Sequence, residues 1–140
     1  MTLDLVRPYF RARANEQSGW SEWTDGFNVD NIPSSVLDKR YHIGVPSVPP
    51  SLIEQRDVTA SATIDVVVFF KGYRNPASCI DTAVSQTQAF MKSCLKASNR
   101  CTFINVKLNG LDFEALNADN DNHVKATVSF LVELSIDPEN

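Results

Sequence analysis

The residues of this chain that could bind a metal ion are few and widely spaced. The candidate ligands are three cysteines and two histidines: Cys79, Cys94, Cys101, His42 and His123. Zinc sites use short spacings such as Cys-x-x-Cys, and none of these residues is spaced in that way. We therefore predict no metal site and no cofactor. We expect Cys94, which falls on the apolar side of a predicted helix, to act as a small hydrophobic residue.

One acidic segment is similar in spacing to a calcium-binding loop. Asp119, Asp121 and His123 alternate along a polar run. The glycine that such a loop requires is absent, and Phe130 stands where the closing glutamate should be. A polar turn between two strands is the simpler interpretation.

Motifs for nucleophilic or acid–base catalysis are also missing. There is no Gly-x-Ser-x-Gly sequence, and the five glycines are isolated, so no phosphate-binding loop is visible. Asp112 and Glu114 would share one face of a strand, as a pair of catalytic carboxylates would. No candidate partner is close to them in sequence, so we expect a solvated face. The sequence predicts that the chain is not an enzyme.

Composition favours one globular domain. Hydrophobic residues make up 43% of the 140 residues and charged residues 21%. The formal net charge of −4 argues against a general nucleic-acid binder. The odd number of cysteines suggests reduced thiols. Asp4 and Arg7 interrupt any signal peptide, and the longest apolar run, Val66 to Phe70, is too short to span a membrane.

Two segments alternate between apolar and polar residues, which is typical of strands with one buried face. In the earlier segment, residues 58–71, the apolar positions are Val58, Ala60, Ala62, Ile64, Val66, Val68 and Phe70. In the later segment they are Val124, Ala126, Val128, Phe130, Val132, Leu134 and Ile136. We predict that both strands belong to the same sheet.

Two helices should position this sheet. Residues 2–16 predict a first helix with Thr2 or Asp4 as N-cap, and Pro8 should kink it or delay its start. Residues 76–97 predict a second helix, which opens with proline at its first position. Its apolar stripe should pack on the sheet. The stripe consists of Ile80, Ala83, Val84, Thr87, Phe90, Met91, Cys94 and Leu95.

Shorter strands complete the predicted fold. Residues 35–43 should form a strand with Leu37, Tyr41 and Ile43 on one face. Residues 102–108 and 111–116 should form a hairpin around Asn109-Gly110, the strongest two-residue turn signal in the chain. The expected fold is one α+β domain over residues 1–140. It has two helices, a mostly antiparallel twisted sheet of four to five strands, and a long loop at 44–57.

Two segments carry exposed apolar residues that could contact a partner. Trp20, Trp23 and Phe27 lie in an irregular segment, where they either cover the core or form a partner contact, and both alternatives stay open. The proline-rich loop favours a contact, because apolar groups on a long loop need cover. Its candidate contact residues are Pro46, Val48, Pro49, Leu52 and Ile53.

Arg7 and Arg11 are one helical turn apart on the first predicted helix. Such a pair could meet an acidic partner surface or nucleic acid. A solvated helix face is the simpler interpretation.

The order of these elements resembles that of the tail-terminator, or tail-completion, proteins of long-tailed bacteriophages. The pieces that match are Asn31-Ile32-Pro33 leading into residues 35–43, the strand 63–70, the helix 76–97 and the terminal strand 124–136. The resemblance covers nearly the whole chain as a pattern of elements and contains no diagnostic motif. Neck and head-completion proteins of phages share much of the plan.

The resemblance implies a structural virion protein that forms a homohexameric ring. One side of such a ring contacts the tail tube protein and the other the head–tail connector. DNA passes through the lumen without sequence readout and no membrane takes part. The acidic net charge suits a channel that repels DNA. A head-completion or neck protein is the nearest alternative. A cellular α+β ligand-binding or adaptor domain is the alternative of another class, and a small hydrolase comes third.

Overall fold

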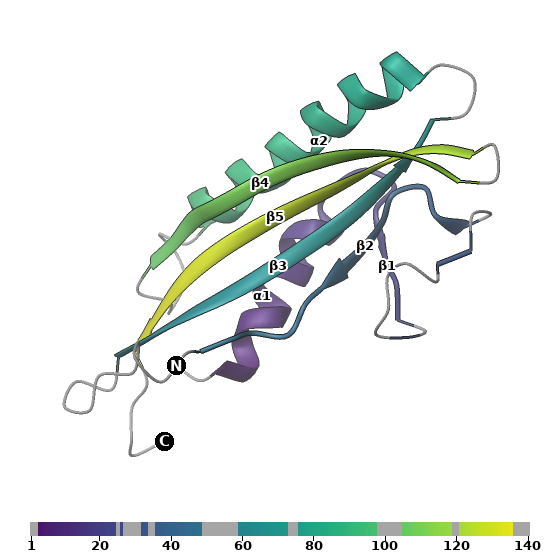
Figure 1. Cartoon of the computed structure of the whole chain (residues 1–140). Coiled ribbons are helices and arrows are strands. Elements are labelled where there is room, and N and C mark those ends of the chain that lie inside the picture. Colours follow the sequence, from purple (N-terminus) through teal and green to yellow (C-terminus); the bar gives the residue numbers. More distant parts are fainter. Residues whose placement is uncertain are drawn as a thin grey trace.

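The computed structural model describes residues 3–24, 26, 32–33, 36–48, 59–72, 76–97, 105–118 and 121–135 (Figure 1). A short 3-10 turn, η1 (Leu3–Leu5), leads into the first helix, α1 (Val6–Asn15). The second helix is α2 (Pro76–Ala97). The strands are β1 (Ser21–Glu22), β2 (Arg40–Ile43), β3 (Thr59–Lys71), β4 (Asn105–Ala118) and β5 (Asp121–Ser135).

The five strands form one sheet in the order β1-β2-β3-β5-β4. β3 and β5 pair antiparallel over their whole length, from Thr59 opposite Ser135 to Lys71 opposite His123. The β2–β3 and β4–β5 pairs are also antiparallel, and β1 pairs with β2 in parallel. Two helices with a mostly antiparallel sheet confirm the predicted α+β class.

Both helices pack on the same face of this sheet, because the two alternating strands bury one face together. Phe130 of β5 marks the centre of the core. Its ring stacks on Phe10 of α1 at a centroid distance of 4.7 Å and meets Phe90 of α2 edge-on at 6.1 Å. Every predicted apolar position of β3 and β5 with a described side chain is buried. These are Ala62, Ile64, Val66, Val68, Phe70, Val124, Ala126, Val128, Phe130 and Val132.

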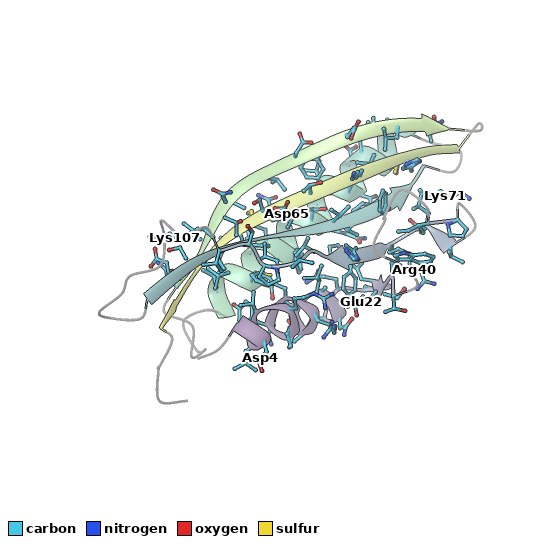
Figure 2. The ribbon with its side chains drawn as sticks, turned by 60° about the horizontal axis from the view of Figure 1, so that its bottom comes forward. Asp4, Glu22, Arg40, Asp65, Lys71 and Lys107 are labelled. Carbon is cyan, nitrogen blue, oxygen red and sulfur yellow. The ribbon has the colours of Figure 1, made fainter. Side chains whose placement is uncertain are left out.

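The other face of the sheet carries polar residues and one small apolar cluster. Asp65 of β3 points away from the helices (Figure 2). Ile32, Leu37 and Phe69 form the small cluster, with Trp23 packed against it. The prediction that Leu37 shares a face with Tyr41 and Ile43 is therefore wrong. Regular pairing of β2 begins only at Arg40, so the period of two cannot be extended back to Leu37.

The start of α1 confirms one expectation and corrects another. Pro8 is the third residue of α1, where a backbone N–H has no partner within a helix, so the helix begins late and accommodates it. The N-cap is Leu5, without a side-chain hydrogen bond, so the prediction of Asp4 as N-cap is wrong. Asp4 lies instead in the preceding 3-10 turn, and Thr2 lies outside the described residues.

The bounds predicted for the second helix are confirmed, and its stripe is shifted. Ala83, Thr87, Phe90 and Cys94 are buried, as is Cys79, which was not assigned to the stripe. Two predicted stripe residues, Ile80 and Val84, remain 43% and 41% exposed. The helix thus leaves an apolar edge uncovered.

The predicted hairpin turn at Asn109-Gly110 is wrong. Residues 105–118 form one continuous strand, and the pairing with β5 slips by one residue between Leu108 and Gly110. Asn109 is the extra residue of a β-bulge, and its Nδ2 donates to Ser129 Oγ at 3.2 Å. The real chain reversal comes between Ala118 and Asp121, within the polar run that we expected to lead into the last strand.

The first part of the predicted long loop, residues 44–48, lies alongside β3 and is hydrogen-bonded to it. The amide of Gly44 donates to the carbonyl of Asp65 at 2.8 Å, and Ser47 and Thr63 exchange two backbone hydrogen bonds of 2.9 Å. Val48 packs against the main core. The remainder of the loop, including Pro49, Leu52 and Ile53, lies outside the described residues.

Candidate functional site

A cleft of about 540 Å³ opens at the edge of the sheet formed by β1 and β2, beside α1. β1 has only two residues, so it covers only part of the outer edge of β2. The cleft lies where that cover ends. It is lined by Arg7, Arg11, Glu22, Trp23, His42 and Val45, among others.

One carboxylate organises the charges of the cleft. Arg11 donates to both oxygens of Glu22, from Nε to Oε1 at 2.9 Å and from Nη2 to Oε2 at 3.3 Å. Arg7 Nη2 lies 3.6 Å from Oε2 of the same residue. Glu22 therefore forms ion pairs with two guanidinium groups. Figure 2 shows Glu22 beside α1. Two positive charges against one negative charge leave the cleft cationic.

The local bonds fix the position of both arginines. The hydrogen bond to Glu22 is the main cause that raises the pKa of Arg11, so this guanidinium stays charged. Arg7 also donates from Nε and Nη2 to the carbonyl of Ile43, at 3.3 and 3.1 Å. That carbonyl lies on the edge of β2 just past the reach of β1. Arg7 thus occupies a backbone acceptor that an added strand would need.

The floor of the cleft is aromatic and its rim is apolar. Trp23 packs on the small cluster, and its backbone amide donates to the carbonyl of Tyr41 at 2.8 Å. Within the described residues, Trp23 Nε1 and His42 Nδ1 are buried without a hydrogen-bond partner. Val45 at the rim is 79% exposed. A tryptophan, two arginines and an exposed valine make a composition that is typical of protein interfaces.

The structure brings three of the predicted contact residues together: Arg7, Arg11 and Trp23 all line the cleft. Phe27 lies outside the described residues, as do Pro49, Leu52 and Ile53. Pro46 is half-buried close to the rim residue Val45 in sequence.

Trp20 belongs to the core, so of the two predicted alternatives, core cover or partner contact, the first holds for this residue. It is 6% exposed, and its Nε1 donates to Gln86 Oε1 of α2 at 3.0 Å. Gly19 has φ +80°, a left-handed conformation that turns the chain after α1 so that Trp20 enters the core. Trp20 is therefore not part of the cleft.

Two important cleft residues were not found from the sequence. Glu22 is an ordinary acidic residue in an irregular segment, and only the tertiary structure places it against Arg7 and Arg11. Val45 was part of the predicted loop without being singled out. Its only sequence signal is an apolar residue next to a proline.

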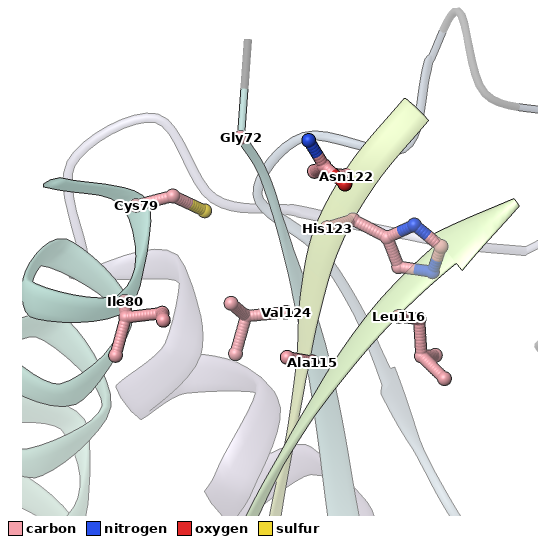
Figure 3. A pocket seen from close by; sticks show the side chains of 8 residues that line it. All are labelled: Gly72, Cys79, Ile80, Ala115, Leu116, Asn122, His123 and Val124. Atoms are coloured by element: carbon pink, nitrogen blue, oxygen red, sulfur yellow. The ribbon is translucent and has the colours of Figure 1, made fainter. Parts of the chain in front are cut away.

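A second pocket, of about 130 Å³, lies between the start of α2 and the β4–β5 hairpin. Cys79 and His123 both line it, but they do not face each other. In Figure 3, Cys79 points from α2 toward Val124, while the ring of His123 lies beyond the strands. Cys79 Sγ donates to the carbonyl of Phe70 at 3.3 Å, and burial raises the pKa of this thiol. A neutral thiol turned away from the imidazole is not an activated nucleophile.

Two further findings concern the described residues alone. No three His, Cys, Asp or Glu side chains gather there in an arrangement that could hold a metal ion. Neither helix combines the length and the hydropathy that crossing a bilayer requires.

Comparison with models of known protein families gives no match, and comparison with curated protein sequences gives none either.

Proposed function

We propose that this chain is a structural subunit of a phage virion, a tail terminator that forms a hexameric ring on the tail tube and joins the tube to the head connector. The observation that carries the proposal is the convergence of Arg7, Arg11 and Trp23 on one charged cleft at a sheet edge. These residues were selected from the sequence as contact candidates. The order of helices and strands, on which the resemblance to tail terminators rests, supports the same proposal.

The charges of the cleft suit contact with a further copy of the chain. The cleft has two guanidinium groups and one carboxylate, whereas the whole chain has a net charge of −4. An acidic side chain of a neighbouring subunit would find guanidinium donors in the cleft and an apolar contact at Val45. A head-to-tail contact between unlike surfaces generates a ring when the rotation closes. The cleft supplies one such surface.

The capping mechanism needs shape complementarity and no chemical reaction. A ring seated on the last layer of tail tube subunits covers the surface to which the next layer would add. Growth of the tube then stops, and the opposite side of the ring is available to the connector. The acidic net charge of the chain is compatible with a lumen that does not retain DNA.

Two alternatives make different predictions. A head-completion or neck protein would use the same subunit plan and bind the connector without stopping tube growth. A cellular adaptor would use the cleft for an acidic peptide, with no ring and no effect on tubes.

The test is tube length in a reconstituted assembly. Tail tube protein of the same phage is polymerised with and without this chain, and lengths are measured by electron microscopy. We expect addition of the chain to shorten the tubes and place a ring at one end. Val45→Asp and Arg11→Glu should lose this effect, because both place a carboxylate in a cleft that already holds Glu22. Lys96→Glu, the same change of charge on the exposed side of α2, should keep it.

Tubes of unchanged length in the presence of the wild-type chain would reject the proposal. Binding to the connector alone would favour the neck protein. Binding of an acidic peptide without any effect on tubes would favour the adaptor.

A further inference from the structure

β4 is the outer strand at the end of the sheet opposite the cleft. It has 14 residues and, among the described strands, pairs only with β5. Its outer side therefore presents backbone N–H and C=O groups away from the sheet. Leu108 and Leu111 on this strand are 42% and 40% exposed. A long edge strand with exposed apolar residues is a template for pairing with another strand.

The register with β5 assigns each side chain of β4 to a face. Leu108, Leu111 and Phe113 stand opposite buried residues of β5, so they lie on the face that carries the helices. Lys107 and Glu114 lie on the other face. Their charges are of opposite sign and stand near the two ends of this stretch of the strand.

We propose that β4 pairs antiparallel with β4 of a second copy of this chain, about a two-fold axis at Leu111. In this count Asn109 and Gly110 together take one position, as they do in the pairing with β5, where Asn109 has no partner of its own. Each Leu111 then faces its symmetry mate, and Leu108 faces Phe113 of the second copy. Lys107 faces Glu114 of the second copy, and the symmetry makes this charge pair twice. Every opposed pair shares a face, as antiparallel pairing requires.

Lys107 can accept a second carboxylate. Its Nζ lies 3.1 Å from Glu133 Oε1, and its side chain is 55% exposed. An ammonium group has three N–H donors, so one bond to Glu133 leaves others for Glu114 of the second copy. The charges of Lys107 and Glu114 thus complement each other under this rotation. Leu111 and the exposed Asp112 stand at the centre of β4, and the register places Asp112 on the face away from the helices, opposite Gly110 of the second copy.

Other arrangements of the edge fit less well. A register shifted by one residue would pair residues on the helix side of one copy with residues on the other face of the second copy, which antiparallel pairing does not allow. A shift by two in one direction would place the axis at Gly110, with the two bulges on either side of it. A shift by two in the other direction would place Asp112 against Asp112 of the second copy. Pairing β4 with the β1 edge of a neighbour would also fit less well. It would place the apolar Leu111 beside the charged Arg7 and Arg11, which lie on the helix side of the cleft.

The helix layer extends the contact beyond the strands. α2 runs along the sheet over β4 and β5 (Figure 1). Its exposed Ile80 and Val84 lie on the same side of the sheet as Leu111. The two-fold rotation brings α2 of each copy to the same side of the joined sheet, next to the interface, where Ile80 and Val84 become less exposed. This dimer is a contact of the free chain and goes beyond the proposed ring contact, because a two-fold axis within the ring would make its two sides equivalent. It leaves the cleft at the opposite edge free.

The first test is the association of the purified chain, measured by sedimentation velocity over a range of concentrations. We expect a dimer whose dissociation constant rises at least tenfold in Leu111→Lys, because the axis places two lysines side by side. Leu5→Lys, at a site 45% exposed on the N-terminal turn, and Val45→Lys in the cleft should leave the dimer unchanged. Circular dichroism establishes that each variant is folded. A strict monomer, or a dimer insensitive to Leu111→Lys, would overturn the proposal.

The second test reads the register by disulfide formation in a Cys101→Ser background. Leu111→Cys should cross-link to a covalent dimer under mild oxidation, because the two thiols meet at the axis. Leu108→Cys, equally exposed, should not. A mixture of Lys107→Cys and Glu114→Cys chains should give the heterodimer. The proposed register would be overturned if Leu108→Cys cross-linked as fast as Leu111→Cys. It would also be overturned if cross-links formed only in a mixture of the Leu108→Cys and Leu111→Cys chains.

Discussion

Glu22 shows how much a single residue contributes to the candidate site. Its carboxylate accepts from Arg11 and lies near Arg7, and its side chain is only 16% exposed. Without it, two guanidinium groups would repel each other at the mouth of the cleft. Its role depends on contacts between segments that are apart in sequence, so periodicity and spacing could not identify it. The two arginines were found because they are one helical turn apart.

The two tryptophans illustrate the same limit. Both stand in one irregular segment, three residues apart, yet Trp20 is in the core and Trp23 lines the cleft. The difference arises from Gly19, which turns Trp20 inward, and from the backbone bond of Trp23 to Tyr41. Neither feature is visible in composition or spacing. The sequence could only leave both alternatives open.

Tyr41 predicts a dependence of stability on alkaline pH. It is fully buried, and its hydroxyl donates to Asn15 Oδ1 at 2.5 Å. Burial raises the pKa of Tyr41 to about 12, and the charge of Glu22 adds to the shift. The unfolded chain loses this proton near pH 10, before the folded chain does. The free energy of unfolding should therefore fall between about pH 10 and 12, by about 1–2 kcal/mol from this group.

Tyr41→Phe isolates this contribution, because the substitution removes the titrating hydroxyl and keeps the buried ring. Near pH 8, the variant should be about 1 kcal/mol less stable, since it lacks the hydrogen bond to Asn15. Urea unfolding near pH 11 should show that difference reduced or reversed. A difference that stays constant with pH would contradict the assignment.

The buried cysteines predict unequal costs of substitution. Cys94 is fully buried and burial strongly raises the pKa of its thiol. Cys94→Ser should lower the free energy of unfolding by about 1–3 kcal/mol, because it buries a hydroxyl in apolar surroundings. Cys79→Ser should cost less, since a serine hydroxyl can keep the bond to the carbonyl of Phe70. Urea unfolding measures both, and a larger cost at Cys79 would be inconsistent with this account.

At the scale of elements, the long periodic segments were predictable and the short or interrupted ones were not. β3, β5 and α2 carry their pattern over 13, 15 and 22 residues, so local sequence determines their type. It also determines the buried face of the two strands, whereas the buried stripe of α2 is shifted toward Cys79 and leaves Ile80 and Val84 exposed. β1 has two residues and exists only because β2 lies beside it. The Asn109-Gly110 signal is local, and the pairing of β4 with β5 along its whole length overrides it. The charges and apolar residues of the cleft depend on such tertiary pairing.

Alanine substitutions at two glycines test two features of the sheet, the bulge at Gly110 and the close approach of Gly72 to β5. At Gly110, an added Cβ would only touch Ser129 Cβ at 3.9 Å, so Gly110→Ala should change stability by less than about 1 kcal/mol. A hairpin turn at this position would need positive φ and make the same substitution costly. At Gly72, an added Cβ would stand 2.8 Å from the carbonyl oxygen of Asn122. Gly72→Ala should therefore cost about 1–3 kcal/mol.

Thermal or urea unfolding of the two alanine variants makes this comparison. A large loss of stability in Gly110→Ala, or none in Gly72→Ala, would contradict the continuous strand and the close approach of Gly72 to β5.

At the scale of the whole molecule, the described sheet has two unlike edges, and both helices cover the same face. The β1–β2 edge has a cationic cleft and a backbone carbonyl occupied by Arg7. The β4 edge has exposed leucines, a lysine near its start and two carboxylates, Asp112 and Glu114, further along. A subunit of this kind can make two different contacts at opposite ends of its sheet. This arrangement supports the proposed role in assembly.

A tail terminator would set the length of tails, so the decisive measurement is electron microscopy of lysates from a phage that lacks this chain. A terminator blocks further addition to the tube, and its absence should affect tail length while heads and tail tube protein are still made. We expect free heads together with overlong tails or tails unable to join heads. Supplying the wild-type chain from a plasmid should restore normal particles, and supplying Val45→Asp should not. Heads that carry attached tails of normal length in the null mutant would contradict the account.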